Sequence, residues 1–368
     1  MTRDLIFQLA LADVPNIGHR NARALTEHFG TAEEVFKAGR HDLENIEGIG
    51  EVTARSIKSF RDFSRAEKEI QFITQYGIEA LYIKSKAYPQ RLLNCQDPPP
   101  LLFYKGNADL NASRVVAIVG TRNNTEYGKS FTEKLVKTLS HYNCLIISGL
   151  AFGIDSIAHK CSLKHGVPTV GVVGHGLDTI YPRQHSGLAK QMVGNGGLLT
   201  EFRSKTNPDK HNFPARNRVV AGIADATIIV ESGVKGGSII TADLAFGYHR
   251  DVFAVPGRTI DTKSGGCNRL IYENRAALLL DPEHFVEAMG WTQAEKKDES
   301  HQKEMFIQLS EQERTVVELL RINKSLSGDE LNFRTDISAG TLATVLLNLE
   351  MQGVLKLMPG SRYVLTDD

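Results

Sequence analysis

VVAIVGTRNNTEYG, residues 115–128, decides the fold, because it joins five apolar residues to a glycine turn and the start of a helix. The apolar run has no polar face, so the strand it forms is expected to be covered on both sides. Similar runs alternate with helical stretches as far as residue 280; they begin near residues 144, 168, 197, 226, 251 and 276. This alternation predicts a doubly wound, mostly parallel α/β sheet.

Glycine-rich turns follow several of these strands, at the sheet edge where ligands of such folds bind. At Gly120-Thr121-Arg122 the backbone can approach an anion, Thr121 can donate a hydrogen bond and Arg122 can bind two oxygens. Further turns contain Gly149 and Gly153, Gly236-Gly237-Ser238, and residues 255–258. Roughly half of such glycines are expected to serve only as βα turns. Together the turns still favour a phosphate-bearing ligand.

KHNFPARNR, residues 210–218, gathers cations and an aromatic ring in nine residues. Cations can hold phosphate oxygens and a ring can stack on a base, as in proteins that bind unpaired nucleic acid. Alone, such a run is more often a solvated surface. Because it lies between the strands near 197 and 226, we expect a loop that opens at the edge of the Gly120-Thr121-Arg122 turn. Arg216 and Arg218 could contact a strand or serve the fold instead.

Other classes of site find little support. The chain has neither GxGxxG after the first strand nor GxxxxGK[ST], so no dinucleotide or P-loop nucleotide is predicted. Asp155, His159 and Glu201 are interpreted as structural rather than catalytic groups. Four cysteines without CxxC spacing argue against zinc or disulfides and fit a reducing cytoplasm. No run reaches membrane-spanning length. Lys plus Arg equals Asp plus Glu at 43 each, so a polyanion must be recognised by a local patch.

The chain is expected to divide at changes in pattern. Residues 1–65 are helical, with two similar turns, VPNIGHRNA at 14–22 and IEGIGEVTA at 46–54, that look like helix-hairpin-helix motifs. Asn16 replaces a glycine in the first, which is tolerable because Asn adopts positive φ more readily than most residues. Whether these turns bind DNA or only pack is open. Residues 66–112 are predicted to be a connector and extension with a short strand at 101–104, and 113–290 the sheet domain.

A polar linker at 291–305 is expected to lead to a winged-helix domain at 306–368, with three helices followed by a hairpin. Its third helix, within 338–353, has no Lys or Arg. A helix that enters a DNA groove normally carries cations, so protein contact or dimerisation is the favoured role.

These pieces resemble the DNA-processing protein A (DprA/Smf) family. The matching segments are VAIVGTRNNTEYG, SGLAFGIDSIAH, GLDTIYP, TEF with KHNFPARNRVVAG, ESGVKGGSIITADLAF, and VFAVPGR with GCNRLI, in the family's order over about 170 residues. The resemblance implies a non-enzymatic protein with a Rossmann-like domain that binds single-stranded DNA. It also implies a homodimer that protects incoming DNA and loads the RecA recombinase during natural transformation.

The resemblance makes Arg122 and Lys210 phosphate ligands and Phe213 the ring that contacts a base. Residues for RecA contact cannot be mapped. No catalytic residue, cofactor or metal is predicted. The complete set of predicted DNA contacts is Gly120, Thr121, Arg122, Gly149, Lys210, Phe213, Pro214, Arg216, Asn217, Arg218, Gly236, Gly237 and Ser238.

Two alternatives stay open. The Gly236-Gly237 turn also looks like the PGGxGTxxE loop of nucleotide phosphoribohydrolases with a related sheet. No proline precedes it here, Ser238 follows directly, and Asp243 stands where a catalytic glutamate would be sought, so the likeness is incomplete. A regulator of double-stranded DNA acting through the winged helix is disfavoured by the excess of acidic residues in 306–368.

Overall fold

The computed structural model describes residues 4–292, 309–323, 325–352, 354–358 and 362–365. The chain forms two units, residues 1–294 and 295–368, which are described separately. The predicted linker at 291–305 lies, apart from its first two residues, outside the described residues.

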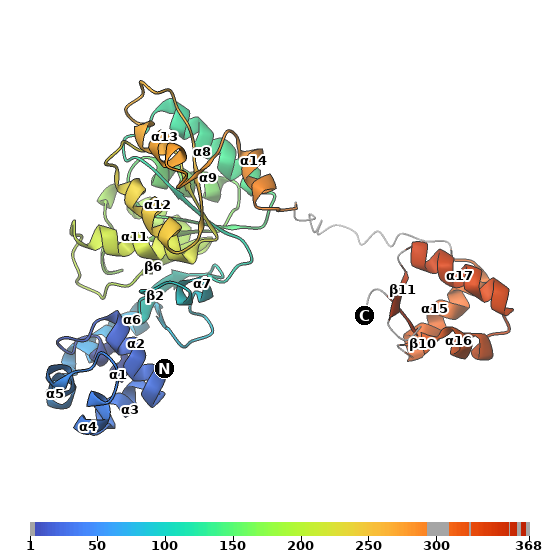
Figure 1. Cartoon of the computed structure of the whole chain (residues 1–368), viewed down its shortest axis with the longest axis horizontal. Helices are drawn as coiled ribbons and strands as arrows, with labels where there is room; N and C mark the ends of the chain where they lie inside the picture. Colours follow the sequence, from blue (N-terminus) through green and yellow to red (C-terminus); the bar gives the residue numbers. More distant parts are fainter. Residues whose placement is uncertain (1–3, 293–308, 324, 353, 359–361, 366–368) are drawn as a thin grey trace. The chain divides into compact units, whose positions relative to one another are not determined.

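A nine-stranded sheet forms the centre of the larger unit, with helices packed around it (Figure 1). Its strand order is β1-β2-β6-β5-β4-β3-β7-β8-β9. Strands β3 to β9 pair in parallel, whereas β1 and β2 are antiparallel at one edge. This confirms the predicted mostly parallel, doubly wound sheet. The strands are β1 Glu79–Tyr82, β2 Leu101–Gly106, β3 Val115–Val119, β4 Leu145–Ser148, β5 Thr169–Val172, β6 Gly196–Thr200, β7 Ala226–Ile229, β8 Asp251–Ala254 and β9 Ala277–Leu278.

Helices cover both faces of this sheet. On one face lie α8 (Glu126–Leu139), α9 (Ile154–Lys164) and α14 (Pro282–Ala288); on the other lie α11 (Asn212–Ile223), α12 (Gly237–Gly247) and α13 (Gly265–Tyr272). Helix α10 (Ser186–Gly194) packs beside β6. In β3, Val115, Ala117 and Val119 enter one core, while Val116 and Ile118 enter the other. The strand is fully buried, which explains why its sequence is apolar at every position.

The sheet changes direction at β3. The chain first adds β4, β5 and β6 on one side of β3, then returns through α11 and adds β7, β8 and β9 on the other. The crossovers that leave β3 and β7 therefore diverge, although these two strands are paired neighbours. A crevice at the carboxyl ends of such a strand pair is the usual ligand site of an open α/β sheet.

The predicted connector contributes strands to the sheet. It contains α6 (Ser64–Tyr76), β1, α7 (Gln90–Leu93) and β2, and β2 pairs with β6. The sequence indicated a short strand leading onward at 101–104, and it gave no sign of β1. Tyr104 fits because two glycines lie beside it: its hydroxyl donates to the Gly196 carbonyl over 2.7 Å, and a Cβ at Gly197 would lie 2.5 Å from its ring.

The first residues fold into α1 (Leu5–Leu11), α2 (His19–Phe29), α3 (Ala32–Lys37), α4 (Arg40–Glu44) and α5 (Glu51–Ser59) around a separate apolar core. The two predicted turns precede α2 and α5. Asn16 has φ 65° and Gly48 has φ 84°, so both occupy the left-handed region. The asparagine thus performs the backbone role expected of a glycine. The helix-hairpin-helix prediction is confirmed by the family match reported below.

The smaller unit has the predicted winged-helix pattern. Its elements are α15 (Glu311–Asn323), β10 (Leu326–Ser327), α16 (Gly328–Arg334), α17 (Ala339–Met351), β11 (Leu355–Met358) and β12 (Arg362–Leu365). The sheet order is β10-β12-β11, and a capping box of Ser327 and Glu330 begins α16. Helix α17 buries Leu342, Leu346 and Leu349 but leaves Met351 80% exposed. Protein contact through this unit stays a prediction.

Candidate nucleic-acid interface

A cleft at the change of direction brings together all the predicted contact residues except Arg218. It encloses about 450 Å³ between the ends of β3, β4 and β7 and the first turns of α11 and α12. The predicted residues that line it are Gly120, Thr121, Arg122, Gly149, Lys210, Phe213, Pro214, Arg216, Asn217, Gly236, Gly237 and Ser238. Segments more than one hundred residues apart therefore meet at one surface.

The turn after β3 depends on close backbone approach. The Thr121 amide donates to the Glu231 carbonyl over 2.7 Å, which ties β3 to the end of β7. A Cβ at Gly120 would lie 2.5 Å from the Ile154 side chain, and one at Gly153 only 2.2 Å from the Thr121 carbonyl oxygen. These glycines let the turn and the start of α9 pack together, which leaves the Arg122 side chain exposed at the cleft.

The expectation of a loop at KHNFPARNR is wrong. Helix α11 begins at Asn212, so only Lys210 and His211 precede it. Pro214 is compatible with this start because the first four N–H groups of a helix have no partner within the helix. Lys210 is exposed in the turn just before the helix. Phe213 and Arg216 are three residues apart and therefore share the helix face that lines the cleft.

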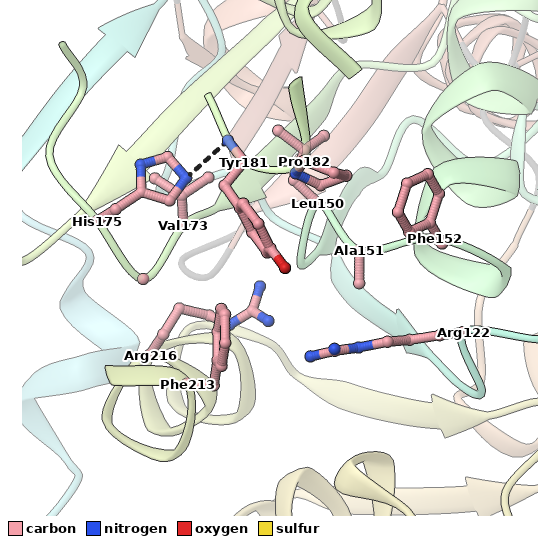
Figure 2. Close-up of a pocket in the computed structure, with 11 residues that line it drawn as sticks. Arg122, Leu150, Ala151, Phe152, Val173, His175, Tyr181, Pro182, Phe213 and Arg216 are labelled. Carbon is pink, nitrogen blue, oxygen red and sulfur yellow. Dashed lines mark hydrogen bonds between the residues drawn. The ribbon is translucent and has the colours of Figure 1, made fainter. Parts of the chain in front are cut away.

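The Arg122 guanidinium carbon lies 5.4 Å from the centre of the Phe213 ring. This cation–π contact joins the turn after β3 to α11. On the same ring, Tyr181 approaches to 6.2 Å between ring centres with a tilt of 33°. Figure 2 shows Arg122, Arg216 and the Tyr181 hydroxyl converging on one space. The site therefore combines guanidinium groups with aromatic faces.

A small recess of about 40 Å³ opens beside the cleft and shares Arg122, Phe213 and Arg216 with it. Its other walls include Phe152, His175 and Tyr181 (Figure 2). None of these three was predicted as a site residue. Tyr181 lies in the segment GLDTIYP, which carried part of the family resemblance. That match is the sequence feature that could have pointed to Tyr181 as a site residue.

Arg216 and Asp155 form the charged floor of the cleft. Arg216 is 8% exposed, and its Nη1 donates to the Val172 carbonyl over 2.6 Å. Its Nε has no hydrogen-bond partner among the described residues. Burial raises the pKa of the Asp155 carboxyl, an effect that the nearby Arg216 charge opposes. The missing side chain of Gly149 leaves space for the Arg216 guanidinium, because a Cβ there would lie 2.2 Å from Arg216 Nη1.

At the other wall, the α12 start is supported by two serines. The Ser238 hydroxyl donates to Ser232 Oγ over 2.8 Å, and a Cβ at Gly236 would lie 2.2 Å from that same oxygen. A Cβ at Gly237 would meet no atom within 4 Å, so its backbone faces open space. The amides at this helix start can therefore approach an anion.

Arg218 does not line the cleft. Its side chain is 9% exposed and pairs with Glu201, whose side chain is 7% exposed. It also donates to the Asp97 carbonyl. Burial raises the pKa of Glu201 to about 7, although Arg218 opposes the rise. The geometry therefore favours a structural role for Arg218 over contact with a DNA strand.

The carboxylate required by the phosphoribohydrolase alternative is also misplaced. Asp243 lies in α12 and pairs with Arg275 at 2.7 Å, and it does not line the cleft. Glu231 instead accepts from the Thr125 amide over 2.9 Å at the start of α8. In the described part of the chain, no three His, Cys, Asp or Glu side chains are grouped closely enough to hold a metal ion.

His159 has a structural role. Its ring nitrogens lie 2.7 Å from Thr169 Oγ1 and 2.6 Å from the Gly149 carbonyl oxygen. Burial lowers its pKa to about 4. The ring is therefore neutral in the folded protein near neutral pH, and it connects α9 to the residue that follows β4 and to the first residue of β5.

We expect His159 to make the protein less stable in acid. Between pH 6.5 and about 4 the unfolded chain binds a proton at this ring and the folded chain does not, so the free energy of unfolding falls as pH falls. A shift of this size corresponds to about 3 kcal/mol across that window. Chemical denaturation at several pH values should show a smaller pH slope for His159→Gln than for the wild type. Equal slopes would contradict the assignment.

The fold defines a Rossmann-like protein whose sheet domain lies, in sequence order, after a helical domain and before a winged-helix domain. Its cleft presents cations and helix-start amides that can approach an anion. The chain belongs to the DNA recombination-mediator protein A family, whose model matches residues 79–290. A helix-hairpin-helix model matches residues 6–71, and a DprA winged helix model matches residues 307–361.

Relatives agree with this assignment. The Smf protein of Synechocystis is 34% identical over 288 residues, covering 77% of this chain and 72% of its own length. The structure of DNA processing protein A from Streptococcus pneumoniae is 32% identical with a TM-score of 0.67, covering 78% of this chain and 98% of that one. The Helicobacter pylori counterpart, whose structure concerns a single-stranded DNA binding mode, is 30% identical with a TM-score of 0.53, covering 59% and 97%. No helix among the described residues is both long and apolar enough to cross a membrane.

Proposed function

We propose that this protein binds single-stranded DNA in the cleft at the ends of β3 and β7. The observation that carries the proposal is the convergence of Arg122, Lys210 and Phe213 on one surface from separate parts of the chain. Two exposed cations can hold successive phosphates, while the ring offers a face for a base. The related Helicobacter pylori protein, described for its single-stranded DNA binding, supports the same substrate.

An unpaired strand suits the cleft better than a duplex. Stacking on Phe213 or Tyr181 requires an exposed base face, and a duplex hides those faces between neighbouring pairs. The contacts proposed here, phosphates on Arg122 and Lys210 and a base face on Phe213, use groups that every nucleotide offers. Binding should therefore depend little on sequence.

The biological role we propose is that of a recombination mediator. Membership of the family supports the view that the chain protects incoming strands and delivers them to RecA during natural transformation, acting as a homodimer. We propose that the cleft holds a strand without cutting it, because the one carboxylate among the described residues that line it, Asp155, is buried beside the Arg216 charge. This assigns the protein a carrier role in place of an enzymatic one.

Binding to oligo-dT of about 30 nucleotides should be strong and salt-sensitive, with much weaker binding to a blunt duplex of equal length. Fluorescence anisotropy at several salt concentrations measures both affinities.

In the same series, RecA added to the coated oligo-dT should start its strand-dependent ATP hydrolysis sooner than on naked DNA. Equal affinity for the two DNA forms would refute the strand-binding proposal, and an unchanged lag would refute the mediator role.

A further inference from the structure

The N-terminal helical domain holds the segment that leads to α11. Arg203, in the stretch between β6 and α11, is 7% exposed, and its guanidinium enters the helical domain. There it pairs with the Asp13 carboxylate and donates to the Leu9 carbonyl. A buried guanidinium is strongly held by such partners, because losing them would leave a charge without solvent or counter-ion.

A second carboxylate, which is buried, holds the next residue. Glu69 of α6 is 4% exposed, and its two oxygens each accept from Ser204: one from the amide over 3.0 Å, the other from the hydroxyl over 2.6 Å. We call Asp13, Glu69, Arg203 and Ser204 the interdomain clasp. Charge-assisted hydrogen bonds of this kind are stronger and more directional than neutral ones. The clasp therefore fixes the backbone at 203–204.

The clasped backbone is bonded in turn to the loop after β5. The Lys205 amide donates to Asp178 Oδ1 over 2.9 Å, and the Gly176 amide donates to the Thr206 carbonyl over 3.1 Å. At Gly176 a Cβ would lie 2.3 Å from the Arg203 carbonyl oxygen, so the two loops are in close contact. Displacing residues 203–206 would therefore displace the loop after β5 as well.

This second loop ends in the candidate DNA site. Leu177 packs both on an apolar cluster formed by residues of α1, α6 and β2 and on the cluster beneath α10. Four residues later, Tyr181 contacts the ring of Phe213. The other loop reaches Lys210 within six residues of Ser204. Both segments that supply cleft residues on this side are thus anchored to the N-terminal helices.

We infer that Asp13 and Glu69 are positioning residues for DNA binding: the N-terminal segment that contains α1 and α6 sets the affinity of the cleft by holding residues 203–206, without itself touching the strand. The inference rests on the proposed function. It gives the N-terminal helices a task that is independent of any DNA contact by the Asn16 and Gly48 turns. Neither Asp13 nor Glu69 lines the cleft.

The test uses full-length Glu69→Ala, with Glu69→Gln as the conservative variant and Glu67→Ala as the matched control. Glu67 lies on the same helix, is exposed, and loses the same charge. Glu69→Ala should bind oligo-dT roughly threefold to tenfold more weakly. Its dependence of affinity on salt should match the wild type, because no phosphate contact is removed. Glu69→Gln, which can still accept from the Ser204 amide, should recover most of the loss.

Hydrogen–deuterium exchange of the free protein provides the second readout. Peptides covering residues 203–212 should exchange faster in Glu69→Ala, while those covering β3 and β4 stay unchanged; Ser204→Ala should give a weaker version of the same result. Faster exchange with wild-type affinity would overturn the inference, as would unchanged exchange. If Glu69→Ala is globally destabilised, Ser204→Ala decides by the same criteria. A wild-type protein that fails to bind oligo-dT would instead refute the proposed function.

Discussion

Replacing Arg122 and Lys210 together by alanine should weaken binding to oligo-dT by at least about 100-fold at low salt, equivalent to about 2.7 kcal/mol. Both side chains are exposed at the cleft and carry permanent positive charge, so each is expected to neutralise one phosphate. For a single strand, each lost phosphate contact should lower the salt slope by about 0.7, so the double variant should lose about 1.4. Anisotropy titrations over a range of salt concentrations give both quantities.

A matched control is available in the loop after β8. Arg258 and Lys263 line a different groove, which also contains Glu126, Glu231 and Asp261. Arg258→Ala/Lys263→Ala removes the same charge from the protein and should change affinity by no more than about twofold. If both double variants lose affinity equally, the effect is one of overall charge. If Arg122→Ala/Lys210→Ala binds like the wild type, the strand lies elsewhere.

The sequence could predict the central sheet because its signal is local. Every position of β3 is apolar, and burial on both faces requires that pattern. The antiparallel strands β1 and β2 could not be placed in the same way. Residue Phe103 pairs with Thr200, nearly one hundred positions later, and nothing in a four-residue apolar run identifies a partner at that distance. The structure supplies the pairing through the close packing of Tyr104 on Gly196 and Gly197.

The site was also predictable only where its signal was local in the sequence. The sequence could gather the contact residues because parallel strands end at a common edge. It could not separate Arg216 from Arg218, since Pro214 and the basic residues obscured the start of α11. Once the helix is placed, its period puts Phe213 and Arg216 on the cleft face and turns Arg218 toward Glu201. No local sequence pattern indicated the role of Arg203, because its partners Leu9 and Asp13 lie 190 or more residues earlier.

Gly153→Ala should both destabilise the protein and impair strand binding. Gly153 has φ 77° and ψ −130°, a conformation that is essentially restricted to glycine. Its new Cβ would also lie 2.2 Å from the Thr121 carbonyl oxygen and 2.7 Å from that of Arg122. These are backbone atoms, so relief requires movement of the turn that positions Arg122. We expect a loss of about 3 kcal/mol in the free energy of unfolding.

The variant Gly166→Ala separates the effect of backbone strain from the effect of the clash with the Thr121 turn. It has φ 70°, but a Cβ there would meet no atom within 4 Å. Gly166→Ala should therefore show backbone strain alone, about 1 kcal/mol, with wild-type affinity for oligo-dT. Gly153→Ala should exceed that loss and bind more than about tenfold more weakly under conditions where it remains folded. Chemical denaturation and anisotropy measure the two effects. Equal behaviour of the variants would mean that the contact between Gly153 and the Thr121 turn does not position Arg122.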